Sequence, residues 1–219
     1  MTQAEKICPH ISSVDEVKIF IAEDSNRKRQ DIFASLGAVG ISTEAIVEIA
    51  EDYEQAAAFI DRQQPGNLEA NVFMLDGSLA MGEPLWQGHQ LALNLFIKYE
   101  EPIQDISKKA RQDLAAVHGG RMSKTGIDAI VSPEAAWDVA LTMLNQDALL
   151  VGISSDRDRG LHGSLAKIPW ASDLSKVGEL TLSALMGDSS FRKHINYHEK
   201  MKSPLRSRPS PQIRQRISR

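Results

Sequence analysis

The strongest constraint in the sequence is a repeat of short apolar runs that end abruptly in polar residues and alternate with amphipathic segments. The runs are rich in β-branched and aromatic residues, as buried strands are. They comprise residues 17–22, 46–50 and 72–75. Strands that alternate with helices at this spacing predict an α/β fold, with a parallel sheet and helices on both of its faces.

The segments between the runs carry helix signals. Ser25 and Asn26 are typical N-cap residues, and Gly37 ends the apolar-periodic segment that follows them. Residues 53–62 predict a second helix, which the Pro-Gly pair at 65–66 terminates. Each predicted helix therefore connects two strands, as in a doubly wound sheet.

The middle of the chain is longer than this alternation needs. Residues 88–99 predict a further helix, and another is predicted by a narrow apolar stripe of Ile103, Ile106, Ala110, Leu114 and Val117. Residues 134–144 follow a Ser-Pro pair and predict a third helix in this region. We expect residues 100–146 to be an inserted helical segment, of which residues 100–133 lie outside the core that covers the sheet.

Two more strands and a helix are predicted toward the C-terminal end. Residues 149–153 form an apolar run that ends at Ser154, and residues 164–168 predict a short fifth strand. A last amphipathic helix begins at Ser172-Asp173 and continues to Leu185. The predicted sheet therefore has five parallel strands and a doubly wound, flavodoxin-like (CheY-like) arrangement.

Charge is distributed unevenly along the chain. The last 28 residues hold nine Lys or Arg and one Glu, about +8, so a net charge of −4 leaves about −12 on the other residues. Prolines, serines and repeated arginines at 203–219 predict a disordered basic tail, which we assign to residues 188–219. Such a tail is either a solubilising extension or a weak contact for nucleic acid or another anionic surface.

Several classes of protein are excluded by what the sequence lacks. The single cysteine, Cys8, excludes an intramolecular disulfide framework and a metal site built from several cysteines. No stretch is long and apolar enough to predict a membrane span, and the first ten residues do not resemble a signal peptide. We therefore expect a cytoplasmic protein.

Charged and hydroxyl side chains follow the predicted strands at the edge where parallel α/β sheets bind ligands. They are Glu23, Asp24, Asp76, Ser154 and Lys167. Three carboxylates at one edge repel each other unless a hard cation or a lysine joins them. Mg²⁺ prefers such oxygen ligands, and a carboxylate beside it can act as a nucleophile toward phosphorus and form an acyl phosphate. A hydroxyl and a lysine opposite would hold the phosphoryl oxygens.

These motifs resemble the receiver domains of two-component response regulators. The segment KIFIAEDSNRKRQDIF is similar to their opening strand with its acidic pair, and VFMLDGS is similar to the strand that carries their phosphoacceptor. VGISS and LAKIP resemble the strands that end in the hydroxyl and the lysine. The resemblance covers residues 17–99 and 147–187 and implies a receiver-like domain at 17–187, preceded by an N-terminal arm at 1–16.

The resemblance also implies a function. Asp76 would be the phosphoacceptor, Glu23 and Asp24 would hold Mg²⁺ together with Asp76, and Ser154 and Lys167 would contact the phosphoryl group. A histidine kinase or phosphotransfer protein would donate the phosphoryl group in a phosphorelay, and a downstream protein target would receive the signal. Self-phosphorylation and slow dephosphorylation are the only chemistry this implies, so we do not expect a metabolic enzyme.

The sequence departs from the receiver pattern in ways that keep alternatives open. Asp76 and Ser154 are separated by about 45 residues more than a plain receiver needs, and Ser164 stands where an aromatic usually precedes the lysine. Lys176 is an alternative to Lys167 at a more typical distance from Ser154. The chain can therefore also be a degenerate receiver that acts as a phosphate-independent interaction module.

A third interpretation of the sequence is a phosphatase of the haloacid dehalogenase type. The segment LDGSLAMGEP resembles the acidic motif of that family, with Asp76 as its general acid. The nucleophile position is then Met74, which cannot attack phosphorus.

Overall fold

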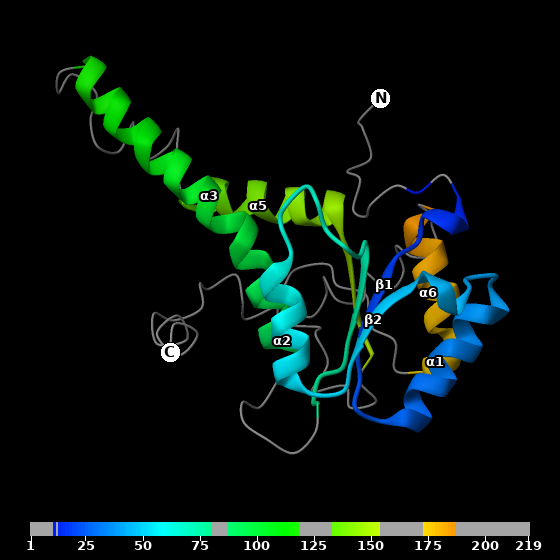
Figure 1. Ribbon diagram of the computed structural model, residues 1–219. Coiled ribbons are helices and arrows are strands. Elements are labelled where there is room, and N and C mark those ends of the chain that lie inside the picture. The colour runs from blue at the N-terminus through cyan, green and yellow to red at the C-terminus, as the bar shows by residue number, and fades with distance from the viewer. Residues whose placement is uncertain (1–10, 12, 80–86, 119–132, 154–172, 187–219) are drawn as a thin grey trace.

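The fold is an α/β arrangement around a parallel sheet (Figure 1). The computed structural model describes residues 11, 13–79, 87–118, 133–153 and 173–186. The predicted fifth strand at 164–168, the basic tail at 188–219 and residues 1–10 of the predicted arm lie outside these ranges. Ile11 and a short 3₁₀ helix, η1 (Val14–Glu16), belong to the same predicted arm, and Ile11 is buried against the domain.

Four described strands form the sheet in the order β2-β1-β3-β4, and all neighbours run parallel. They are β1 (Ile19–Ala22), β2 (Ile46–Ala50), β3 (Val72–Leu75) and β4 (Leu149–Gly152). The chain passes from β1 outward to β2, and then crosses to the other side of β1 for β3. This reversal makes the carboxyl ends of β1 and β3 a topological switch point, where open α/β sheets bind ligands.

Helices cover both faces of the sheet, as predicted. One face carries α1 (Asn26–Ala38) and α6 (Val177–Leu185), which begins directly after η3 (Leu174–Lys176). The other carries α2 (Tyr53–Arg62), α3 (Gln87–His118) and α5 (Pro133–Asp147). Figure 1 shows the two groups on opposite sides of the strands. A further 3₁₀ turn, η2 (Thr43–Ala45), leads into β2.

Alternation along the central strands builds two separate cores. Ile19 and Ile21 of β1 pack in the core under α1 and α6, whereas Phe20 and Ala22 pack in the core under α2 and α3. The Phe20 ring stacks on Phe59 of α2 with ring centroids 4.0 Å apart. Burial on both faces explains why β1 and β3 are continuous apolar runs rather than alternating ones.

The middle of the chain differs from the prediction of two helices at 88–99 and 103–117. One continuous helix, α3, spans this region with Pro102 inside it. A proline removes one backbone hydrogen bond, which favours a helix boundary. Here Tyr99 and Ile103, on either side of Pro102, both pack against the same core and support the helix through that position.

The apolar stripe predicted in the second half of α3 is also partly wrong. Ile106 is 64% exposed, whereas Ser107 is buried, so the buried face is rotated relative to the stripe. Within the predicted insertion at 100–146, α5 packs along α3 and places Ala140 and Leu144 in the core. None of the described helices combines the length and apolar character needed to cross a bilayer.

Gly178 allows α6 to touch the backbone of α1. The Ser35 side chain of α1 accepts a hydrogen bond from the Gly178 backbone N–H (2.9 Å) and donates one to the Ser175 carbonyl oxygen (2.8 Å). A Cβ atom at position 178 would lie 2.2 Å from the Ser35 carbonyl oxygen. The close approach of the two helices therefore requires glycine here.

We predict that Gly178→Ala destabilises the fold by about 1–3 kcal/mol, because the added methyl group overpacks the contact between α1 and α6. Gly37→Ala is the matched control, since Gly37 lies in α1 and a Cβ there meets nothing within 4 Å. Urea unfolding of the two variants measures the difference. Equal stabilities would contradict this account of the helix contact.

Candidate functional site

Three acidic residues meet at the switch point between β1 and β3. Ala22 of β1 and Leu75 of β3 are paired in register, so the residues that follow them emerge at the same level of the sheet. The Asp76 backbone N–H donates to the Ala22 carbonyl oxygen (2.9 Å), which continues the strand pairing by one residue. Glu23 and Asp24 follow β1, and Asp76 follows β3.

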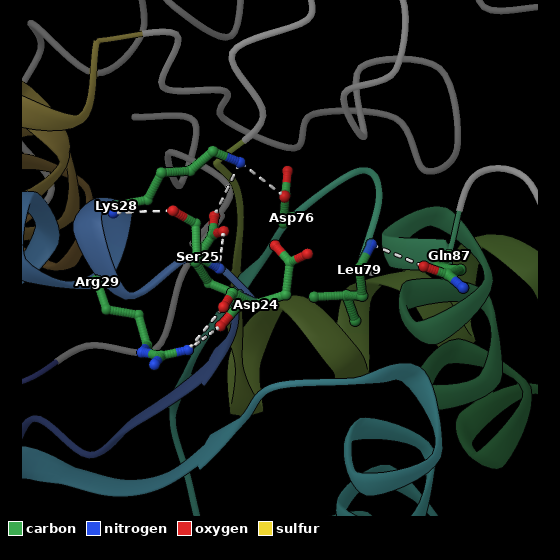
Figure 2. Close-up of polar contacts among 8 residues, drawn as sticks. Asp24, Ser25, Lys28, Arg29, Asp76, Leu79 and Gln87 are labelled. Atoms are coloured by element: carbon green, nitrogen blue, oxygen red, sulfur yellow. Dashed lines mark hydrogen bonds and ion pairs between the residues drawn. The ribbon is translucent and has the colours of Figure 1, made fainter. Parts of the chain in front are cut away.

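The carboxylates of these residues lie close together. One carboxylate oxygen from each of Glu23, Asp24 and Asp76 lies within 4.8 Å of the others. Glu23 is fully buried, Asp76 is 2% exposed and Asp24 is exposed. Figure 2 shows the Asp24 carboxylate turned toward Asp76. The structure thus brings together the three acids that were predicted to hold a metal.

Lys28, from the first turn of α1, supplies a positive charge to this cluster. Its Nζ atom forms a hydrogen bond with Asp76 Oδ2 at 3.0 Å (Figure 2). The same Nζ atom lies 3.3 Å from Glu23 Oε2. Glu23 Oε2 is buried and has no hydrogen-bond partner among the described atoms, so its contact with Lys28 is an ion pair without hydrogen-bond geometry. One lysine therefore joins the carboxylates that follow two different strands.

Lys28 was not among the predicted site residues, although the sequence holds a signal for it. Ser25 caps α1, and its side chain accepts a hydrogen bond from the Lys28 backbone N–H (3.4 Å). Lys28 is thus the third residue of α1, and side chains on a helix lean toward its N-terminal end. Only the N-cap Ser25 separates that end of α1 from Glu23 and Asp24, so a long side chain at this position points toward the carboxylates.

The backbone of the loop between β1 and α1 is held in place from both sides. The Ser25 backbone N–H donates to Glu23 Oε1 (2.9 Å). Arg29 Nη1 donates to the carbonyl oxygens of Glu23 (2.9 Å) and Asp24 (3.1 Å), and Arg29 Nη2 forms an ion pair with Glu51 (2.8 Å). Arg29 therefore ties the loop after β1 to the residue that follows β2.

Helix α3 approaches Asp76 from the opposite side. A Cβ atom at Gly88 would lie 2.0 Å from the Asp76 carbonyl oxygen, so only glycine permits this contact. The neighbouring Gln87 accepts a hydrogen bond from the Leu79 backbone N–H through its side-chain oxygen (2.7 Å, Figure 2). The backbone around Asp76 is consequently fixed by both β1 and α3.

Burial and charge change the acidity of the cluster. The pKa of Glu23 rises to about 7, chiefly because burial disfavours its charge and also because Asp76 is negative. Burial likewise raises the pKa of Asp76, although Lys28 opposes the effect. Burial acts to lower the pKa of Lys28, but Asp76 and Glu23 outweigh it and raise the pKa, so the ammonium remains charged.

The other predicted site residues are not part of the described cluster. Ser154 and Lys167 lie outside the described residues. Lys176 lies in η3, where its exposed side chain forms an ion pair with Asp173 (3.9 Å). Met74, which occupies the nucleophile position in the phosphatase interpretation, is buried in the core under α1 and α6.

The donor set fits a small divalent cation. Two oxygens bound to one Mg²⁺ at about 2.1 Å are at most about 4.2 Å apart, so a limited inward rotation of the three carboxylates suffices. The buried Glu23 Oε2 also has an acceptor position that no hydrogen bond fills in the described structure. Oxygen-only ligands with a net negative charge suit Mg²⁺ better than a softer metal.

No family model, no curated protein and no solved structure matches this chain in the comparisons with known proteins.

The raised pKa of Glu23 predicts a stability difference that depends on pH. The native state keeps a proton on Glu23 up to about pH 7, whereas the unfolded chain releases it near 4.5. The stability that the native state gains by holding this proton is fully present below pH 4.5 and is lost as the pH rises through 7. As the pH is raised from 5 to 8 in EDTA, the free energy of unfolding of Glu23→Gln should therefore increase relative to that of wild type by on the order of 2–3 kcal/mol.

Chemical denaturation of both proteins at several pH values measures this gain. Glu54→Gln, at an exposed position in α2, is the control and should follow wild type throughout. A constant difference between Glu23→Gln and wild type from pH 5 to pH 8 would show that Glu23 titrates normally.

Removing the exposed acid tests the metal site itself. Asp24→Asn should weaken Mg²⁺ binding by about tenfold or more, because ligand charge sets the affinity of such sites. In EDTA the same change should leave the melting temperature equal or slightly higher, since it removes one of three like charges. Asp31→Asn, at an exposed position in α1, is the control for calorimetric titration and melting. A lower melting temperature in EDTA with unchanged Mg²⁺ affinity would show that the acids are not a metal site.

Proposed function

We propose that this chain is a receiver-like signalling protein in which Asp76 accepts a phosphoryl group. The supporting observation is the position of the Asp76 carboxylate. It lies at the switch point between β1 and β3, within 4.8 Å of two further carboxylates and 3.0 Å from a lysine ammonium. The strand order β2-β1-β3-β4 is that of the first four strands in flavodoxin-like sheets, where ligands bind at this same point.

The chemistry requires an ionised and correctly placed Asp76. One carboxylate oxygen attacks phosphorus, an oxygen–phosphorus bond forms, and the bond from phosphorus to the donor breaks. With a phosphohistidine donor the leaving group is an imidazole, which takes up a proton. Lys28 favours the charged carboxylate of Asp76, and the contacts of Asp76 with β1 and α3 hold its backbone while the attack takes place.

The remaining groups of the site have separate electrostatic roles. Glu23, Asp24 and Asp76 are the residues that would hold Mg²⁺, which supplies positive charge to the phosphoryl oxygens when it is bound. Ser154 and Lys167 are the residues that the resemblance assigns to the phosphoryl group. In this proposal the donor is a histidine kinase or phosphotransfer protein, the site is a self-phosphorylating switch rather than a metabolic enzyme, and the output is binding of a downstream protein.

A second function is favoured by the position of Lys28. Because one ammonium already compensates Glu23 and Asp76, the domain can keep these buried charges without a metal or a phosphoryl group. In that case the fold works as a phosphate-independent interaction module. The two functions differ in whether Asp76 is ever phosphorylated.

Intact mass spectrometry after incubation with acetyl phosphate and Mg²⁺ distinguishes them. We predict that the wild-type protein gains the mass of one phosphoryl group in Mg²⁺ but not in EDTA, and that hydroxylamine removes it, as expected of an acyl phosphate. Asp76→Asn should gain nothing, and Asp31→Asn should behave as wild type. A wild-type protein without an adduct would favour the interaction module, and an adduct on Asp76→Asn would place the phosphoryl group elsewhere.

A further inference from the structure

We propose that Lys28 occupies the place of the divalent cation in the metal-free protein, so that the ammonium and the metal bind the same carboxylates in turn. This inference rests on the proposed function, because it concerns the metal site of the same acids. It goes beyond that function by assigning the chain its own resident cation. Lys28 then determines how strongly the site binds a metal.

The position of the Lys28 ammonium carries the inference. Nζ lies between the acids that follow β1 and β3, at 3.3 Å from Glu23 Oε2 and 3.0 Å from Asp76 Oδ2. Figure 2 shows its side chain crossing from α1 to the strand ends to reach this point. A divalent cation held by the same two carboxylates would need the same space.

The local structure shows that the carboxylates, and not the helix, favour a lysine there. Lys28 is the third residue of α1, close to the positive end of the helix dipole, where a cation is unfavourable. Acids or neutral residues are favoured at such a position. The unfavourable interaction is offset because two buried carboxylates lie directly in front of the helix.

The ammonium and the metal exclude each other. Each of them satisfies its charge with the same oxygens, and a positive charge about 3 Å from a ligand oxygen strongly opposes a second cation there. Glu23 Oε1 already accepts a hydrogen bond from the Ser25 backbone, which leaves Oε2 for a cation. The Lys28 side chain is 29% exposed, so its flexible stem can swing into solvent when a metal enters.

The two cations leave the site with different net charges. Three carboxylates and one ammonium sum to −2 when all are ionised, whereas three carboxylates and one Mg²⁺ sum to −1. The resting site is thus partly compensated and stable without a metal, and metal binding must displace Lys28. A lysine that only held the acids in position would have the opposite effect, because its removal would weaken metal binding.

Metal titration of charge-matched variants separates these roles. We expect Lys28→Met to raise the Mg²⁺ affinity about tenfold or more. Arg27→Met, an exposed neighbour that loses the same charge, should change it less than about threefold, because exposed charges are screened. Lys28→Arg keeps the charge and should bind Mg²⁺ no more tightly than wild type. Isothermal titration calorimetry measures all four proteins, with melting curves in EDTA and in saturating Mg²⁺.

A second measurement needs no variant. Acetic anhydride labelling followed by peptide mass spectrometry reports how reactive each lysine of the wild-type protein is. Lys28 should react faster in Mg²⁺ than in EDTA, because the metal releases its ammonium from the carboxylates. Lys18, which is exposed at the opposite end of β1, should react equally in both conditions.

The outcomes separate this inference from the proposed function. If Lys28→Met binds Mg²⁺ no more tightly than wild type does, or if Mg²⁺ leaves the labelling of Lys28 unchanged, the competition is overturned while the metal site stands. Absence of Mg²⁺ binding in both wild type and Lys28→Met would overturn both. Tighter binding in Lys28→Met without phosphorylation of Asp76 would support the competition and contradict only the signalling function.

Discussion

Two buried carboxylates at the ends of adjacent parallel strands need a compensating cation, and the structure depends on how the chain meets this need. Burial of Glu23 and Asp76 without compensation would strongly destabilise the ionised state. The described structure meets the need with Lys28, which reaches back from the first turn of α1. The path of the chain from β1 into α1 is therefore part of the site and not merely a connection.

The topology of the sheet determines where the carboxylates and their compensating cation meet. The strand order reverses at β1, so the ends of β1 and β3 open toward the same space while helices cover both faces. Arg29 fixes the loop after β1, and Gly88 lets α3 contact the backbone of Asp76. The carboxylates are thus held by backbone contacts on both sides, and their cation is the component that can be exchanged.

The strands and the acidic cluster could be predicted from the sequence because both follow from local patterns. Apolar runs that end in acids place Glu23, Asp24 and Asp76 at one edge of any parallel sheet. Lys28 lies in a basic stretch that is typical of a solvated helix, so only its position in the first turn of α1, close behind the acids, distinguishes it from its neighbours. The continuity of α3 depends on packing around Pro102 that no local pattern reveals, and the burial of Ser107 instead of Ile106 depends on neighbours distant in the sequence.

The central claim is that one cation position, shared by Glu23 and Asp76, is occupied by Lys28 or by a metal. A crystal structure of the wild-type protein grown in Mn²⁺ tests it most directly, because the anomalous signal locates the metal without assumption. The account predicts an anomalous peak bound by Asp76 and its neighbouring acids, with the Lys28 side chain turned into solvent. A map with Lys28 still bridging Glu23 and Asp76 and no peak beside them, or a peak beside them with the Lys28 bridge intact, would contradict it.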